Sequence, residues 1–225
     1  MRAIKILAFD ASGKSISAAA LEGARILAES FENTGLNHSV RLLPMISAVL
    51  DSVGWKVRDL DRIAVVAGPG SFTGVRICVS TARALAQPFE IPCAAVNSLE
   101  TLACANTFIG IVCPMLDARA GQVYASAYMF PEGERIIGDT AVHIDEYLDT
   151  LKAVARRERI LFCGDAITFR DKILTAFPNA LFSTAPLRAS AAGIIAAERA
   201  PVRFDEILPI YLRKPQAERL ADNQT

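Results

Sequence analysis

The chain has 225 residues, 52% of them hydrophobic, and its 24 acidic and 24 basic side chains give a formal net charge of zero. This length allows one domain or two small ones, and the neutral balance argues against a protein that binds nucleic acid by itself. No stretch approaches the ~20 apolar residues of a membrane span, and the five cysteines have no Cys-x-x-Cys spacing. We therefore expect a cytoplasmic protein with free thiols and no membrane partner.

The apolar pattern predicts an α/β protein, because short apolar runs alternate with longer segments of helical period. In the first part of the chain we expect strands at 3–9, 15–21, 24–31, 63–67 and 92–96, and helices at 38–53, after the turn at 68–71 and from 97. In the second part we expect helices at 144–153, 168–176 and 189–199, a strand at 159–163 and an extended segment at 208–213.

The chain contains a similar segment twice. LAFDASGKSISAAAL (7–21) aligns without gaps with PMLDARAGQVYASAY (114–128), so that Asp10 matches Asp117. Chance similarity between two hairpins is the alternative to a true internal repeat. A repeat predicts two halves of βββαβα type, at 1–106 and 107–225, with the last helix packing back on the first half.

Two duplicated halves that each open with a hairpin carrying Asp at its tip resemble the actin-like (ASKHA) superfamily, which includes actin and sugar kinases. The resemblance implies that the two tips face a nucleotide in the cleft between the halves. Asp10 with Ser12, and Asp117 with Arg119, are then the positions to examine. Aspartate is also a favoured turn residue, and both interpretations remain open.

The segment GPGSFTGVR (68–76) places a glycine-rich turn between a strand and a helix. Its glycine spacing is neither that of a dinucleotide site nor that of a P-loop. Backbone N–H groups of Gly70 and Ser71 are nevertheless candidates for holding a phosphate at the start of the helix. The alternative is that the glycines only allow a sharp turn.

The helix at 38–53 and the helix after the glycine-rich turn each carry two apolar stripes. A helix at the rim of a domain needs only one buried stripe. The second stripe indicates either full burial or a surface that a partner covers, and we favour the partner. The expected partner-contacting residues are His38, Leu42, Met45, Val49, Thr73, Arg76, Ile77, Ser80, Thr81 and Ala84.

Six segments, found in order between residue 4 and about residue 213, resemble the TsaB (YeaZ) family: LAFDAS, HSVRLLPMI, GPGSFTGVRICVSTARALA, VNSLETLA, LDARAGQVYAS and PIYLR. The resemblance implies a non-catalytic subunit that forms a homodimer alone and a heterodimer with TsaD. TsaD transfers a threonylcarbamoyl group to N6 of adenosine 37 in tRNAs reading ANN codons, and the ATPase TsaE joins the assembly. We then expect tRNA to be held through the complex and no intrinsic cofactor, with ATP or ADP at the shared interface left open.

The residues allow a check on the expected inactivity. In the catalytic relative, two histidines four residues apart bind a metal on one helix; the matching positions here are Ser98 and Leu102. The only histidines are His38 and His143. We therefore expect no catalytic and no metal-binding residues. The alternative function is an ATP-dependent phosphotransferase or peptidase of the actin-like fold, for which the second half lacks a matching glycine-rich turn.

Overall fold

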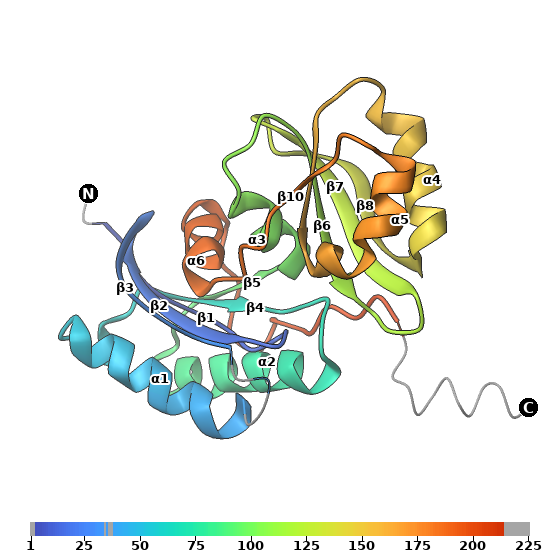
Figure 1. The fold of residues 1–225 in the computed structure, drawn as a ribbon. Coiled ribbons are helices and arrows are strands. Elements are labelled where there is room, and N and C mark those ends of the chain that lie inside the picture. Colours follow the sequence, from blue (N-terminus) through green and yellow to red (C-terminus); the bar gives the residue numbers. More distant parts are fainter. Residues whose placement is uncertain (1–2, 34, 36–37, 214–225) are drawn as a thin grey trace, which may run out of the picture.

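The structure is a computed structural model that describes residues 3–33, 35 and 38–213. It contains two five-stranded mixed sheets (Figure 1). The first has the order β3-β2-β1-β4-β5 and is built from β1 (Lys5–Asp10), β2 (Ile16–Glu22), β3 (Arg25–Glu32), β4 (Arg62–Val66) and β5 (Cys93–Val96). The second has the order β10-β9-β6-β7-β8 and is built from β6 (Gly110–Asp117), β7 (Gln122–Phe130), β8 (Glu134–His143), β9 (Ile160–Gly164) and β10 (Leu181–Phe182).

Within residues 3–33, 35 and 38–213, six α-helices and three short 3₁₀ helices connect and cover these strands. The α-helices are α1 (His38–Ser52), α2 (Phe72–Ala86), α3 (Ser98–Cys104), α4 (Ile144–Ala155), α5 (Arg170–Ala176) and α6 (Ala189–Glu198). The 3₁₀ helices are η1 (Val57–Asp59), η2 (Gln87–Phe89) and η3 (Asp165–Phe169). None of the helices in the described part of the chain is long and apolar enough to cross a membrane.

The two sheets repeat one topology. In the first, β1 pairs antiparallel with β2 and parallel with β4. In the second, β6 pairs antiparallel with β7 and parallel with β9. The duplicated actin-like α/β fold predicted from the repeated hairpin is therefore confirmed. The sequence prediction omits β8 and the two-residue β10, which complete the second sheet.

The elements stack in layers (Figure 1). Helices α1 and α2 cover one face of the first sheet, α3 and α6 lie between the two sheets, and α4 and α5 cover the outer face of the second sheet. Helix α6 packs on β1 and β2, and α3 packs on β6. The buried cluster between the sheets accordingly mixes both parts of the chain, with Ile6, Val66 and Leu102 beside Val112 and Cys163.

After α6 the chain returns to the first sheet as a segment of residues 202–213, here called the strap. Val202 forms an antiparallel bridge with Cys93 at the edge of β5. Farther along, Ile210 donates its backbone N–H to the carbonyl of Ala67, 2.7 Å away. The strap therefore crosses from the edge of the first sheet to the end of β4, where the glycine-rich turn begins.

Candidate functional site

A cleft of about 480 Å³ lies where the tips of the two leading hairpins approach each other. Four segments line it: residues 12–14 of the first hairpin, 69–73 of the glycine-rich turn, 116–119 of the second hairpin, and 210–213 of the strap. Tyr124 and Asp165 complete the lining. The structure thus brings Ser12, Gly70 and Ser71 together at one cleft, and their role as phosphate contacts stays a prediction.

Asp10 does not reach this cleft. It has no exposed surface, and its Oδ1 atom accepts the backbone N–H of Ser12 at 2.8 Å. Asp117 makes the same local contact, since its Oδ1 atom accepts the N–H of Arg119 at 2.8 Å. Both aspartates therefore serve as turn residues that hold the hairpin tip, which is the alternative left open by the sequence.

Burial makes the carboxyl group of Asp10 a weaker acid than usual. Desolvation raises its pKa to about 6, although hydrogen bonds from Ser12 act in the opposite direction. Its second carboxylate oxygen, Oδ2, has no hydrogen-bond partner among the described residues. Beside it, the buried thiol of Cys78 on α2 accepts the N–H of Ala11, and burial raises the pKa of that thiol as well.

The glycines of the turn make room for backbone from elsewhere in the chain. A Cβ atom on Gly70 would lie 2.4 Å from the carbonyl oxygen of Ser12, and one on Gly74 would lie 2.0 Å from that of Ala11. The N–H of Ser71 is already donated to the carbonyl of Ser12 at 2.7 Å. The first hairpin is therefore packed directly against the turn and the start of α2.

The strap packs closely against Gly68, the remaining glycine of the turn. A Cβ atom on Gly68 would lie 2.6 Å from the carbonyl oxygen of Ile210. Ser71 caps α2, because its Oγ atom accepts the N–H of Gly74 at 3.3 Å. The glycine-rich turn is thus explained by close packing and helix capping within the chain itself.

Three polar contacts link the segments that line the cleft. Lys14 Nζ lies 3.3 Å from Asp165 Oδ1, and Asp165 Oδ2 accepts the N–H of Asp117 at 3.1 Å. Arg213 of the strap donates to the carbonyl of Ala118 at 3.1 Å. These contacts join the first hairpin, the second hairpin and the strap around one opening.

An actin-like fold implies a nucleotide with its magnesium ion in this cleft, and that group requires free carboxylates. Asp10 is fully buried, Asp117 holds its own turn, and Asp165 is paired with Lys14. Asp10 is thus unavailable to a ligand in the cleft, whereas Asp117 is exposed and lines it, and no reaction step through a nucleotide follows from this geometry.

The start of α3, where the sequence comparison expects Ser98 and Leu102 in place of metal ligands, is a packing junction. Ser98 donates its hydroxyl to the carbonyl of Pro69 at 2.5 Å, and Leu102 is buried between the sheets. Within the described residues, no three His, Cys, Asp or Glu side chains are grouped so as to hold a metal ion. His38 lies 3.4 Å from the carbonyl of Lys14, and His143 caps α4.

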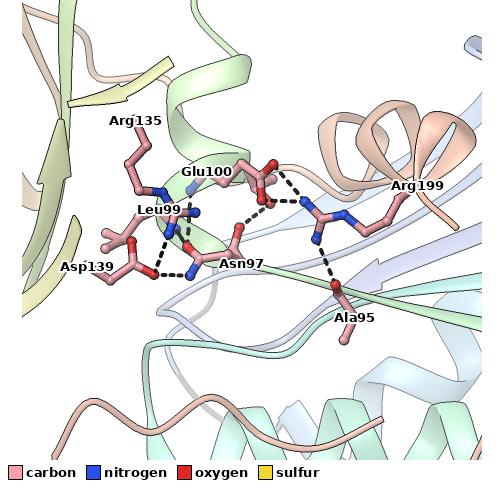
Figure 2. A network of polar contacts seen from close by, with 8 residues as sticks. Ala95, Asn97, Leu99, Glu100, Arg135, Asp139 and Arg199 are labelled. Atoms are coloured by element: carbon pink, nitrogen blue, oxygen red, sulfur yellow. Dashed lines mark hydrogen bonds and ion pairs between the residues drawn. The ribbon is translucent and has the colours of Figure 1, made fainter. Parts of the chain in front are cut away.

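Figure 2 shows a polar network at this junction. Asn97 caps α3 through its Oδ1 atom and donates its Nδ2 group to Asp139 on β8 at 2.6 Å. Glu100 accepts two hydrogen bonds from Arg199, at 2.7 and 2.8 Å, and Arg199 also donates to the carbonyl of Ala95. The network ties α3 to the second sheet on one side and to the end of α6 on the other.

A second candidate surface is the outer face of α1 and α2, here called the helical face. Its exposed residues are Val40, Leu43, Pro44, Ser47 and Ala48 on α1, and Thr73, Arg76, Ser80 and Ala84 on α2, with Ile77 and Thr81 half-buried beside them. Small side chains predominate, which permits the close approach of another helix. Six of the ten residues expected to contact a partner lie on this face, and His38 begins α1.

The sequence interpretation assigns Leu42, Met45 and Val49 to the partner-contacting surface, and the structure shows that this assignment is wrong. They are at most 5% exposed and belong to the core under the first sheet. With Ile46 and Leu50 they follow the spacing of one buried helical stripe. The large apolar side chains that α1 leaves exposed are Val40 at 70% and Leu43 at 50%.

Sequence reasoning also missed the role of the strap. Tyr211 stacks on Phe72, with ring centroids 4.8 Å apart, and its hydroxyl accepts a hydrogen bond from Arg76 Nε at 3.0 Å. The Arg76 guanidinium lies over the Phe72 ring at 3.8 Å. The only signal was the segment PIYLR, whose partners lie about 135 positions earlier in the chain.

The chain was compared with known proteins. The profile of the family described as TsaD, tRNA N6-adenosine threonylcarbamoyltransferase, matches residues 26–219. The chain is 34% identical to the tRNA threonylcarbamoyladenosine biosynthesis protein TsaB of Bacillus subtilis (strain 168), over 95% of this chain and 96% of that relative. It is 35% identical to TsaB of Escherichia coli (strain K12) over 57% of each chain. The solved structure of YeaZ from Pseudomonas aeruginosa is 28% identical and has a TM-score of 0.75, covering 92% of this chain and 99% of that one.

Proposed function

The chain belongs to the TsaB family of tRNA threonylcarbamoyladenosine biosynthesis proteins, and on that premise we propose that it is a non-catalytic subunit of the transferase system. In this proposal it acts in the synthesis of threonylcarbamoyladenosine by supporting TsaD, which transfers the threonylcarbamoyl group to N6 of adenosine 37 in tRNAs reading ANN codons. The chain supplies a surface and no reacting group.

The observation that carries this proposal is the state of the two hairpin tips. Asp10 and Asp117 each hold a backbone N–H two residues ahead, and the glycines of the turn are filled by the chain's own carbonyl groups. Ser98 and Leu102 stand where the catalytic relative has metal-binding histidines. The metal-binding histidines are thus replaced, Asp10 is buried, and Asp117 holds its own turn.

The helical face is the proposed docking site for TsaD and, in the absence of TsaD, for a second copy of the chain. Apart from Arg76, its exposed side chains are small or apolar, and it lies on the first sheet, away from the second (Figure 1). TsaE is proposed to join the assembled pair. With a net charge of zero, the chain is proposed to meet tRNA only through the complex, since phosphate contacts require several cationic side chains.

No intrinsic cofactor is part of the proposal. Any ATP or ADP held by the complex is proposed to bind at the surface shared between subunits. The rival function, an ATP-dependent phosphotransferase or peptidase, predicts turnover by the purified chain alone. Loss of that turnover in Asp10→Ala would support the rival.

Reconstitution tests the proposal. Threonylcarbamoyl transfer to a substrate tRNA is measured with TsaD and TsaE, with and without this chain, and with a Ser80→Arg variant. Omission of the chain should abolish modification, and Ser80→Arg should reduce it by weakening retention of TsaD, because Ser80 is exposed on the helical face. Ile109→Arg is the matched control, since Ile109 is 72% exposed between α3 and β6. Equal modification without the chain would refute the proposed role.

A further inference from the structure

We propose that Arg76 on α2 binds a carboxylate side chain of the subunit that docks on the helical face, and that this ion pair favours TsaD over a second copy of the chain. This inference rests on the proposed function, because it names the chemistry by which the helical face recognises TsaD. The chain holds the Arg76 guanidinium group in place and leaves its outer N–H groups without an acceptor.

Two aromatic side chains fix the orientation of Arg76. The guanidinium carbon lies 3.8 Å from the centre of the Phe72 ring, and the Nε atom donates to the Tyr211 hydroxyl at 3.0 Å. The two rings stack on each other with centroids 4.8 Å apart. An arginine that is already ordered in this way loses little side-chain freedom when it binds a partner.

The outer edge of the Arg76 guanidinium remains available. Of the N–H donors of this side chain, Tyr211 takes the one on Nε. Neither Nη atom forms a hydrogen bond or an ion pair with another described residue, and the side chain is exposed. The two Nη groups match the two oxygens of a carboxylate, which they bind through parallel hydrogen bonds.

The other arginines of α1 and α2 are engaged within the chain. Arg41 on α1 pairs with Glu32 of β3. Arg83 on α2 donates to two carbonyl groups of the strap, at 3.0 and 2.5 Å. Among the described arginines of these two helices, Arg76 is therefore the one whose outer donors are free for another subunit.

The two helices of a second copy do not supply the missing carboxylate. They contain a single acidic residue, Asp51, which lies 3.6 Å from Lys56. In a two-fold dimer the same patch meets itself, so a second copy brings another Arg76 and small side chains. Covering the unpaired guanidinium would remove its water without replacing the lost hydrogen bonds, which costs free energy. A partner that presents a carboxylate is favoured for this reason.

The strap adds further charged side chains beside α2. Asp205 pairs with Arg203 at 2.9 Å, whereas Glu206 is exposed. Because Arg83 bonds the carbonyl of Asp205, Glu206 lies near the Arg83 end of α2, about 10 Å along the helix from Arg76. Glu206 is the carboxylate by which a second copy would meet Arg76, and Glu206→Gln tests that alternative.

Binding of purified TsaD to the immobilised full chain, measured at several salt concentrations, tests the inference. Arg76→Gln should raise the dissociation constant for TsaD at least about tenfold and flatten its salt dependence, because an ion pair is lost. Arg76→Lys should restore part of the affinity, since lysine keeps the charge without the forked hydrogen bonds. Both variants lose the guanidinium contact with Tyr211, so the difference between them reports the charge and not the packing of the strap.

The homodimer provides the comparison. Its dissociation constant, measured by sedimentation velocity, should not rise in Arg76→Gln; if the wild-type chain stays monomeric, TsaD binding alone decides. Arg157→Gln is the matched control, because Arg157 is exposed in the second half of the chain and its replacement removes the same charge away from the helical face. It should change neither constant.

The remaining outcomes separate the inference from the proposed function. Unchanged TsaD affinity in Arg76→Gln, or equal losses of TsaD affinity and homodimer affinity, would overturn the role of Arg76 and leave the proposed function standing. The same holds if Glu206→Gln weakens the homodimer as much as Arg76→Gln does, because the second copy then supplies the carboxylate. A wild-type chain that does not bind TsaD refutes the proposed function, and the role of Arg76 falls with it.

Discussion

Gly74→Ala isolates the packing of the first hairpin on α2. Gly74 lies inside the helix and is buried, so alanine would improve its intrinsic helix propensity by about 1 kcal/mol. The added Cβ atom would however lie 2.0 Å from the carbonyl oxygen of Ala11 and 3.0 Å from its carbonyl carbon. Carbon–oxygen contacts begin at about 3.3 Å, so the helix and the hairpin must separate by roughly 1 Å.

The size of the destabilisation depends on whether the colliding groups can move apart. Both colliding groups are backbone, and Ala11 follows directly on β1. Overpacking in a close-packed core costs about 1–3 kcal/mol, and the upper end applies where no side chain can rotate away. After the propensity gain, we expect a net loss of about 2 kcal/mol. For a chain of this size that lowers Tm by roughly 4–8 °C.

Alanine substitutions at two other glycines, Gly193 and Gly138, serve as comparisons. Gly193 on α6 would meet only the methyl ends of Leu21 and the Cβ atom of Ala8, and Gly138 on β8 would meet nothing within 4 Å. Thermal unfolding followed by circular dichroism should therefore rank Gly138→Ala highest in Tm, Gly193→Ala next and Gly74→Ala lowest. A Gly74→Ala variant as stable as the wild type would show that the turn is not fixed by this contact.

Two further predictions concern the buried carboxylate of Asp10 and the partly buried carboxylate of Asp139. The pKa of Asp10 is raised from 3.8 to about 6 in the folded chain. The contribution of Asp10 to stability is therefore full below about pH 4 and is lost as the pH rises through 6. The shift corresponds to about 3 kcal/mol. The free energy of unfolding of Asp10→Asn, relative to wild type, should therefore be higher at about pH 7.5 than at about pH 4.5, and a difference independent of pH would contradict this. Asn97→Asp should destabilise the chain by roughly 1–3 kcal/mol although Asp is an equally good helix cap, because Asp139 Oδ2 lies 2.6 Å from the Asn97 amide. Asp139→Asn in the same chain should restore stability in chemical denaturation, and failure to do so would remove this carboxylate pair as the cause.

The duplicated fold could be predicted because the repeat is local. The Asp10 and Asp117 hairpins carry the same pattern within 15 residues, and both form the same antiparallel pair. The inward face of α1 was predictable in principle. Its buried residues follow the spacing of a single stripe, and the error lay in dividing them between two stripes.

The purpose of the glycine-rich turn could not be predicted from the sequence. Glycine at positions 70 and 74 is compatible with a phosphate and equally with close backbone packing. The difference depends on what lies opposite, namely Ser12 and Ala11, which are about 60 residues away. The contact of Tyr211 with Phe72 and Arg76 is more distant still, and no periodicity records such a contact.

The location of the helical face follows from a difference between the two halves. After β4 the first half continues into α2, a helix of 15 residues. After β9 the second half continues into η3 and then α5, with five and seven residues. The first hairpin is sealed under the longer helix, and Asp10 is buried with it. The second hairpin instead meets Asp165 at the start of η3 and stays exposed. Among the described residues, only the first half has its leading strand packed under a helix of 15 residues, which supports the proposed location of the partner surface on that helix and α1.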